Sequence, residues 1–501
     1  MRAQGSLEYL IILAIVIAVM AVVASFAIGY FSTQSDQFQY ASCSNAAAIC
    51  RDTLIVSQSD QCPMCDNACN YTNGTEIFTN ATVCCKQGQA SEIYTGSPGC
   101  GPQSCSDGTL ASTCSSVTLG KYCVGPYFRD LCSTCDCLSS LRCNVGNNKC
   151  GTLSFEPGKS IWHANPSGSW AVAIGDADND GSNDVVAGFY SLSGLSVKLF
   201  SFKTGIWTET VLPAGSSYGV HSIAIGDINA DGSKEVVVGF ELGGTAATLS
   251  AFNFTAGAWA KSDAGVGSPV GAVAIGDINK NGKNVIAASI GVNAYVMIFE
   301  PRPLVLWSYT TVDNVGEIVP SVVIADADND GNIEIVAGTT GSSNQLIAYS
   351  NKSGAWIKSV IGSPGQVTSI AVGDVDGDNK NETVVGTQSN GLNIYKYVDG
   401  SWLQTIIPEP TKINSVAIGD ANNDGSNDVV IGLKPTNNEL RMYTNTSGRW
   451  VETLMHDEPL YEIASVAVGN ADNQQGIDVV TTLGSFSSGY VDMYTGSWTY
   501  A

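Results

Sequence analysis

The sequence predicts an all-β fold, a seven-bladed β-propeller, preceded by an N-terminal hydrophobic helix and a small disulfide-rich domain. One pattern of apolar strands around an acidic loop occurs seven times in residues 151–501, at spacings of 51, 50, 49, 48, 46 and 50 residues. All 16 cysteines lie in residues 43–150, and a long apolar run lies near the N-terminus. Only 14% of the 501 residues are charged and 54 are glycine, which favours turn-rich β structure over solvated helices.

The N-terminal apolar run covers residues 10–28 and contains 19 residues, of which only Ser25 is polar. At about 1.5 Å per residue, a helix of this length spans a hydrocarbon core of about 30 Å. A secretory signal has a shorter apolar region followed by small residues at its cleavage site, whereas here the polar residues QGSLEY precede the run. We therefore expect residues 4–42 to hold a retained helix and a linker, with the membrane as a partner.

The residues before this run resemble the class III signal of euryarchaeal pilins, in which a prepilin-type peptidase cuts before a Gln in a QxSxE context. Gln4, Ser6 and Glu8 match that context, and cleavage after Ala3 removes residues 1–3 as a leader. The resemblance implies a surface or filament location and other pilin subunits as partners. An unpaired carboxylate in lipid is costly, so Glu8 is expected to pair with the free amine of a neighbouring subunit. A single-pass anchor with Glu8 in the headgroup region is the alternative.

The cysteine-rich segment, residues 43–150, has too few aliphatic residues to fold on hydrophobic burial alone. Outside the cell its thiols oxidise, so we expect disulfides whose pairing the sequence does not determine. The CxxC pairs at 62–65 and 132–135 leave a zinc site as the alternative. The cysteines are Cys43, Cys50, Cys62, Cys65, Cys69, Cys84, Cys85, Cys100, Cys105, Cys114, Cys123, Cys132, Cys135, Cys137, Cys143 and Cys150.

Glycosylation sequons of the form N-x-Ser/Thr agree with an exported chain, although the motif also arises by chance in this composition. They begin at Asn70, Asn73, Asn80, Asn253, Asn351, Asn381 and Asn445.

Each repeat of residues 151–501 contains an apolar strand, an acidic loop, a second apolar strand and two further strands joined by a glycine-containing turn. Radial closure leaves few exposed sheet edges, whereas an open solenoid is the alternative. We expect residues 154–164 to add a strand to the last blade and close the ring. A tryptophan recurs in the last strand and is expected to pack between blades: Trp207, Trp259, Trp307, Trp356, Trp402, Trp450 and Trp498.

The acidic loops have the residue pattern of a hard-cation site. In loop 1, Asp176, Asp178 and Asp180 alternate, Gly181 permits a turn with positive φ, and Asp184 adds a fourth carboxylate. Such an oxygen cage fits Ca²⁺, which would relieve the repulsion between the carboxylates. The flanking strands exclude an EF-hand, and solvated acidic turns are the alternative.

Five loops have enough oxygen ligands for strong Ca²⁺ sites, and loops 3 and 7 are expected to bind weakly or not at all. Loop 3 is expected to be one residue short. In loop 5, Asn379 replaces the glycine and tolerates the same backbone angle. The ligands of loops 2, 4, 5 and 6 are Asp227, Asn229, Asp231 and Glu235; Asp326, Asp328, Asp330 and Glu334; Asp374, Asp376, Asp378 and Glu382; and Asp420, Asn422, Asp424 and Asp428. The weak loops offer Asp277, Asn279 and Asn281, and Asn470, Asp472 and Asp478.

The net charge of −23 excludes a nucleic-acid partner, because it repels phosphates. Of 46 acidic residues, 21 occupy the ligand positions, so nearly all of the excess over the 23 basic residues lies in these loops. A generally acidic surface would spread its charge over the whole chain instead.

The repeats resemble FG-GAP or VCBS repeats, the propeller of the integrin α head, over about 350 residues. The resemblance implies Ca²⁺-stabilised blades and a face suited to an extracellular protein or glycan ligand. With the N-terminal helix, it implies a pilin-like or membrane-anchored adhesin at the cell surface. The chain has no HExxH motif, and we expect no enzyme. A structural filament subunit without a ligand and a membrane-tethered glycan-active enzyme are the alternatives.

Overall fold

The computed structural model describes most of the chain from residue 149 to residue 500. Its gaps in this range are residues 156–157, 165–167, 191–196, 215–218, 242–248, 292–293, 302–306, 353, 435–438, 447, 458–460, 475 and 486–487. Before residue 149 it describes five short strands, β1 (Thr72–Asn73), β2 (Glu76–Ile77), β3 (Lys121–Val124), β4 (Tyr127–Asp130) and β5 (Arg142–Asn144). β1 pairs with β2 and β3 pairs with β4, both antiparallel.

The predictions for the N-terminal part fall outside the described residues. They concern residues 1–42, and the side chains of the cysteines and of the first three sequon asparagines. Within the part of the chain that is described, no helix is long and apolar enough to cross a membrane.

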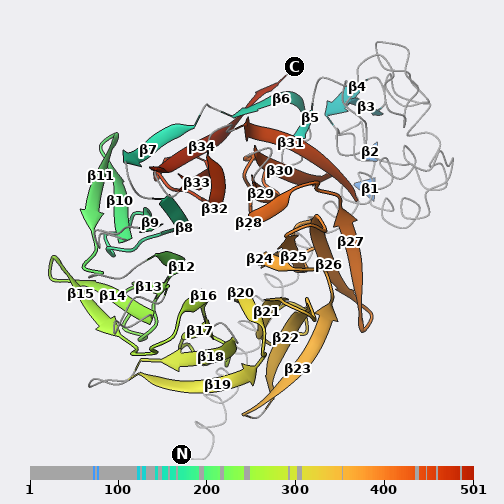
Figure 1. Ribbon diagram of the computed structural model, residues 1–501. Helices are drawn as coiled ribbons and strands as arrows, with labels where there is room; N and C mark the ends of the chain where they lie inside the picture. The colour runs from blue at the N-terminus through green and yellow to red at the C-terminus, as the bar shows by residue number, and fades with distance from the viewer. Residues whose placement is uncertain are drawn as a thin grey trace, which may run out of the picture. The chain divides into compact units, whose positions relative to one another are not determined.

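Residues 151–501, together with residues 144–147, belong to one compact unit, and its described part is a seven-bladed all-β propeller (Figure 1). This confirms the predicted propeller fold. Within a blade, consecutive strands pair antiparallel and lead from the axis outwards. Second strands such as 235–240 are buried at every residue, whereas fourth strands such as 206–211 are mostly exposed. Continuous apolar runs therefore mark the strand that is covered on both faces.

The blades are numbered from the N-terminal end, and their strands are given in order from the axis outwards. Blade 1 contains β8 (Gly168–Gly175), β9 (Asp184–Tyr190), β10 (Val197–Lys203) and β11 (Ile206–Val211), and blade 2 contains β12 (Val220–Gly226), β13 (Glu235–Phe240), β14 (Leu249–Thr255) and β15 (Ala258–Asp263). Blade 3 contains β16 (Val270–Gly276), β17 (Val285–Ile290), β18 (Tyr295–Glu300) and β19 (Ser308–Asn314), and blade 4 contains β20 (Ile318–Ala325), β21 (Glu334–Thr340), β22 (Leu346–Lys352) and β23 (Ala355–Gly362). Blade 5 contains β24 (Val367–Gly373), β25 (Glu382–Thr387), β26 (Leu392–Val398) and β27 (Ser401–Ile407), and blade 6 contains β28 (Lys412–Gly419), β29 (Asp428–Lys434), β30 (Glu439–Thr446) and β31 (Arg449–Asp457). Blade 7 contains β32 (Glu462–Gly469), β33 (Asp478–Ser485) and β34 (Ser488–Tyr500), with β7 (Lys159–Ala164) as its outer strand.

The ring closes through strands from both ends of the propeller sequence. β34 pairs with β7 along residues 489–493, and further along it pairs with β6 (Lys149–Phe155). The prediction that residues 154–164 add a strand to the last blade is thus confirmed. Closure gives blade 7 its fourth strand, so its third strand is not left as an exposed edge.

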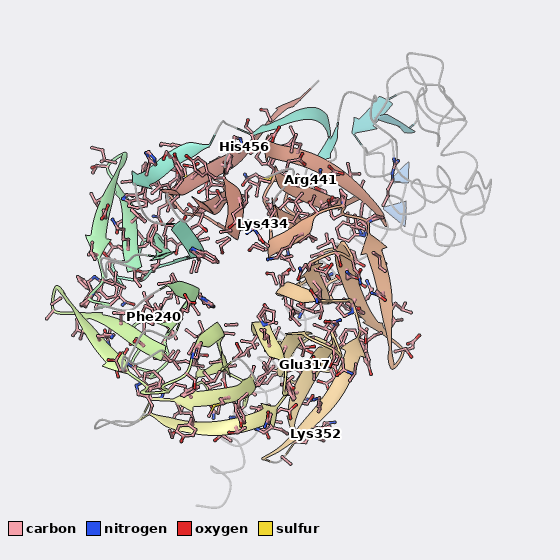
Figure 2. The ribbon with its side chains drawn as sticks, viewed as in Figure 1. Phe240, Glu317, Lys352, Lys434, Arg441 and His456 are labelled. Atoms are coloured by element: carbon pink, nitrogen blue, oxygen red, sulfur yellow. The ribbon has the colours of Figure 1, made fainter. Side chains whose placement is uncertain are left out.

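Seven apolar clusters, each shared by two neighbouring blades, hold the ring together. Phe240, for example, is fully buried in the cluster between blades 1 and 2 (Figure 2). Six of the recurrent tryptophans pack against these clusters, which confirms their predicted place between blades, and the side chain of Trp498 is outside the described residues. One of the six, Trp307, precedes β19 instead of lying within it.

Close contact between blades requires glycine in the second strands. A Cβ placed on Gly188 would lie only 2.3 Å from Cγ1 of Val220, the first residue of the next innermost strand. A Cβ on Gly386 would lie 2.7 Å from Cγ2 of Ile413 in the same way. The small residue allows the next blade to pack directly against the backbone.

Candidate functional site

All seven acidic loops lie at one end of the propeller. Each loop leads from an innermost strand to the second strand of its blade, as residues 176–183 lead from β8 to β9. Because all the innermost strands run in the same direction along the axis, the loops that follow them lie at the same end of the propeller. The starts of those strands mark the opposite end.

A fixed set of hydrogen bonds shapes the loops. In loop 1, the amide of Gly181 donates to Oδ2 of Asp176 at 3.2 Å, and the amide of Asp180 donates to Oδ1 of Asp178 at 3.2 Å. Oδ2 of the ninth residue, Asp184, accepts the amide of Ala177 at 3.1 Å. Equivalent bonds to the first and ninth residues recur in loops 2, 4 and 5. In loop 6 the bond to the first residue recurs, and the amide of the third residue, Asn422, donates to Asp428, as that of Asp178 also does to Asp184 in loop 1. The repeated residue types thus build one recurrent backbone frame.

Loops 1 and 4 best fit a divalent cation. One carboxylate oxygen each from Asp176, Asp178 and Asp184 lies within 4.8 Å of the others, and loop 4 gathers its first, third and ninth carboxylates in the same way. Oδ1 of Asp176 and Oδ1 of Asp326 are buried and have no hydrogen-bond partner among the described residues. A bound Ca²⁺ would supply the partner that these oxygens lack. The fifth-position residues Asp180 and Asp330 are not part of these two clusters.

The ninth carboxylate of each complete loop is buried at the start of a second strand. Burial raises the pKa of Asp184 to about 6, and the pKa values of Glu235, Glu334 and Glu382 to about 7, against the opposing effect of hydrogen bonds. Burial also raises the pKa of Asp428, well above its ordinary value. A nearby cation would reverse these shifts, because opposite charge favours the ionised form.

Loops 2 and 6 have asparagine at the third position, and its amide nitrogen faces the carboxylates. Nδ2 of Asn229 donates to Oε1 of Glu235 at 3.0 Å, and Nδ2 of Asn422 donates to Oδ1 of Asp428 at 3.2 Å. The amide oxygen would face an ion only after rotation of the side chain by half a turn. Neither loop gathers three carboxylates as loops 1 and 4 do.

Loop 5 gathers Asp374, Asp376 and Glu382, but a lysine lies among its carboxylates. Nζ of Lys396 lies 2.8 Å from Oδ2 of Asp378 and 3.3 Å from Oε1 of Glu382, and it also contacts Asp376. Lys396 pairs across the sheet with Glu382, at the position where blades 1, 4 and 7 have a serine or a threonine. Its ammonium group supplies the positive charge that the loop would otherwise take from an ion. Loop 5 therefore fits Ca²⁺ less well than loops 1 and 4, and the predicted number of about five strong sites is not supported.

Loops 3 and 7 lack ligands, but loop 3 differs from the expectation. It is not one residue short. β17 begins at Val285, eight residues after Asp277, just as β13 begins eight residues after Asp227. The ninth ligand is replaced by an apolar residue, while the amide of Gly282 still donates to Oδ2 of Asp277 at 2.6 Å. In loop 7, Nδ2 of Asn470 donates to the carbonyl of Gln474 at 2.7 Å, which closes the turn from within.

Asparagine side chains join neighbouring loops, a feature that the sequence analysis missed. Asn329, the fourth residue of loop 4, donates from Nδ2 to the carbonyl of Asn381 at 3.0 Å and accepts the amide of that residue at 2.7 Å. Nδ2 of Asn381 donates in turn to the carbonyl of Asp326 at 2.8 Å, so a glycan on this sequon would compete with that contact. Similar bonds start from Asn179, Asn183, Asn284, Asn423, Asn427 and Asn473. The signal was present as asparagine at the fourth and eighth loop positions.

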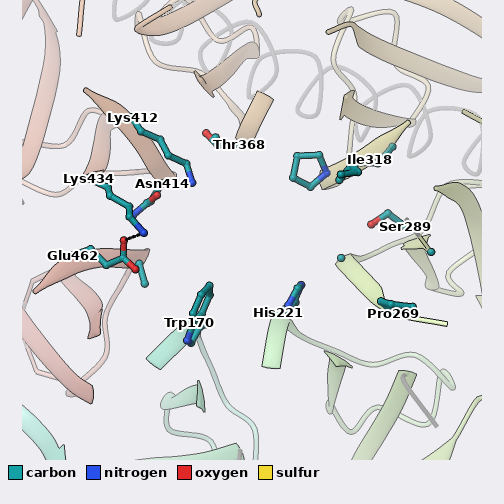
Figure 3. A pocket seen from close by; sticks show the side chains of 15 residues that line it. Trp170, His221, Pro269, Ser289, Ile318, Thr368, Lys412, Asn414, Lys434 and Glu462 are labelled. Carbon is teal, nitrogen blue, oxygen red and sulfur yellow. Dashed lines mark ion pairs between the residues drawn. The ribbon is translucent and has the colours of Figure 1, made fainter. Parts of the chain in front are cut away.

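A cavity of about 450 Å³ lies on the axis at the end where the innermost strands begin (Figure 3). Its wall includes Trp170 of β8, His221 of β12, Thr368 of β24, and Lys412 and Asn414 of β28. Burial lowers the pKa of His221 and that of Lys412. No sequence motif marks this site, because no residue type recurs at one position of every innermost strand.

Comparison with known proteins agrees with the repeat structure. An FG-GAP-like repeat model matches residues 326–385 and 374–431, and each match runs from one acidic loop through the next. The chain contains FG-GAP-like repeats. Among solved structures, the propeller resembles the crystal structure of the β-propeller domain of Cps50 (Swd1) from Myceliophteria thermophila, with 12% identity and a TM-score of 0.48, covering 68% of this chain and 99% of that chain. A search of curated proteins finds no match to this chain.

Proposed function

We propose that this chain is a binding protein displayed outside the cell, a pilin-like or membrane-anchored adhesin whose Ca²⁺-bound propeller holds an extracellular protein or glycan. The FG-GAP-like propeller fits a ligand-binding or adhesin-like role. The observation that carries the proposal is the separation of the two ends of the ring. The acidic loops occupy one end, and the axial cavity opens at the other.

This separation lets metal binding stabilise the scaffold without occupying the surface offered to a ligand. Ca²⁺ would neutralise the carboxylate clusters of loops 1 and 4, and the bonds between neighbouring loops would spread that order to adjacent blades. The N-terminal helix would hold the propeller at the membrane or in a filament.

Immunogold electron microscopy of intact cells with an antibody against the propeller tests display. We expect label on the outer surface: dense label along fibres identifies a filament subunit, terminal label a tip protein, and diffuse label an anchored one. Label confined to the cell interior would contradict the proposal. Binding of the full chain in detergent to glycan and surface-protein arrays, with and without Ca²⁺, tests recognition. The alternative of a structural subunit is favoured only if the fibres are labelled and both arrays stay blank.

A further inference from the structure

We propose that the axial cavity binds an acidic sugar unit, with its carboxylate paired to Lys412 and its ring stacked on Trp170. This inference rests on the proposed binding function and names the ligand class and the residues that recognise it. Three observations carry it: the size and position of the cavity, a lysine that forms no ion pair among the described residues, and an exposed tryptophan in the same wall.

The cavity has the position and size of a small-molecule site. Residues of all seven innermost strands line it, so it lies where the blades converge on the axis. Its volume of about 450 Å³ falls within the range of about 300–1,000 Å³ that is usual for ligand pockets. Such a pocket can enclose one or two sugar units and does not admit a folded protein.

The charges in the wall favour an anion. Lys434 forms an ion pair with Glu462 (Figure 3), whereas among the described residues no carboxylate lies within ion-pair distance of Lys412. Lys412 is half-buried, and its pKa is lowered by burial and then by the charge of Lys434, against the smaller opposing effect of Glu462. A ligand carboxylate would provide Lys412 with a directly paired counterion, which is notable in a chain whose net charge is −23.

The rest of the wall favours a sugar over a simple anion. Trp170 is 38% exposed, although it belongs to an innermost strand, and it lies beside His221 in the cavity wall (Figure 3). An indole ring offers a flat apolar face with a polar N–H edge, which suits the C–H face of a pyranose. Thr368 and Asn414 place polar groups in the wall and are held by bonds to backbone carbonyls at 2.6 and 3.0 Å. Such fixed polar groups orient a ligand that carries several hydroxyl groups.

Isothermal titration calorimetry on the full chain in detergent with Ca²⁺ tests the inference. The probes are glucuronate, galacturonate, glucose and inorganic phosphate. We expect one of the uronates to bind at least tenfold more tightly than glucose and phosphate. Glucose binding as tightly as the uronates would overturn the role of Lys412. Phosphate binding as tightly, and unaffected by Trp170→Ala, would overturn the role of the sugar ring.

Variants locate the binding in the cavity. Lys412→Met and Trp170→Ala should each weaken uronate binding at least tenfold, and Trp170→Tyr should restore most of it because it keeps an aromatic face. Lys261→Met removes the same charge from an outer strand, β15, and should leave binding unchanged. Thermal melts of each variant separate loss of binding from loss of folding. Equal uronate affinity in Lys412→Met and the unchanged chain, with both folded, would overturn the assignment.

The outcomes also separate this inference from the proposed function. Surface label with glycan binding that Lys412→Met does not alter would keep the adhesin proposal and reject the cavity as its site. Uronate binding through Lys412 in a chain found only inside the cell would support the cavity site and reject the adhesin.

Discussion

The ninth residue of each complete acidic loop accepts the hydrogen bonds that shape the loop, but its burial disfavours the ionised carboxylate. Asp184 accepts the amide of Ala177 at 3.1 Å and the hydroxyl of Ser201 at 2.5 Å, so it holds the loop against the second and third strands. The same burial makes its ionised form costly and raises its pKa to about 6. The loop therefore keeps its shape without an ion, while its carboxylates still favour a cation.

These raised pKa values predict how stability depends on pH when metal is removed. Between pH about 4 and 7 the unfolded chain loses protons that the folded loops keep, so in EGTA the free energy of unfolding should fall as the pH rises through this window. Saturating Ca²⁺ should remove or reverse the trend, because it holds the carboxylates ionised. Urea unfolding at pH 5 and pH 8, in EGTA and in Ca²⁺, measures both. A free energy of unfolding that rises with pH in EGTA would contradict the raised pKa values of the ninth carboxylates.

Lys396 predicts a gain of metal binding on mutation. Lys396→Ser places a hydroxyl where Ser201 and Ser350 lie in blades 1 and 4, and it removes the ammonium from loop 5. We expect about one additional Ca²⁺ per chain, measured by calorimetry and by elemental analysis. Lys203→Ser is the matched control, because Lys203 is half exposed, pairs at 2.6 Å with Asp180 outside the cluster of loop 1, and reaches Asp178 only at 3.6 Å, so the number of bound ions should not change. An unchanged stoichiometry in Lys396→Ser would show that the lysine does not exclude the ion.

At the scale of elements, the bonds between loops couple adjacent blades. Asn329 has a φ of 58°, so Asn329→Gly removes its two side-chain bonds to residue 381 without adding backbone strain. We expect a loss of about 1–2 kcal/mol in the free energy of unfolding. Lys280, with a φ of 53°, occupies the fourth position of loop 3, and no bond from its side chain is described within residues 149–500. Lys280→Gly should therefore leave stability unchanged or slightly raised, and equal losses in both variants would argue against the coupling.

The packing of second strands predicts a further loss. Gly188→Ala would place a methyl group 2.3 Å from Cγ1 of Val220, so blades 1 and 2 would have to separate. Overpacking of this kind costs about 1–3 kcal/mol. Gly205→Ala, in the turn between β10 and β11, meets no atom within 4 Å and tests the separate cost of positive φ. Denaturant unfolding of both variants measures the difference, and a neutral Gly188→Ala would mean that the interface is looser than described.

At this scale, the features that could be predicted from the sequence are the ones that repeat from blade to blade. The spacing of the strands, the acidic loops and the tryptophans recur from blade to blade. Each repeat therefore supports the assignment of strands and loops in the others. Lys396 was not predictable, because it is 14 residues from Glu382 in the sequence and meets it only through the register of β25 and β26. Loop 3 was misjudged for another reason: Val285 occupies the ninth position without a carboxylate, and the missing ligand was interpreted as a missing residue. The cavity was not predictable, because its wall is assembled from all seven blades and no residue type recurs at one position of every innermost strand.

At the scale of the whole molecule, the loops distribute metal dependence around the ring. Ca²⁺ at about a hundred times its dissociation constant adds about 2.7 kcal/mol for each occupied site. We expect EGTA to lower the melting temperature of the full chain, and Asp326→Asn to remove part of the difference by weakening loop 4. Asp277→Asn in loop 3 should remove much less, because that loop keeps only one carboxylate. Differential scanning calorimetry of the unchanged chain and of the two variants, with and without EGTA, measures these differences. A melting temperature that EGTA does not change would show that bound metal does not stabilise the fold.

The seam in the last blade also constrains how the protein is made. Ser154 and Ser497, whose hydroxyls lie 3.1 Å apart, are separated by 343 positions in the chain. The ring therefore stays open until the final strand has left the ribosome or the export channel. Every earlier nascent form presents an unpaired strand edge to other chains, so the residues of β34 are decisive for escaping aggregation. A truncation there should reduce yield far more than its short length suggests.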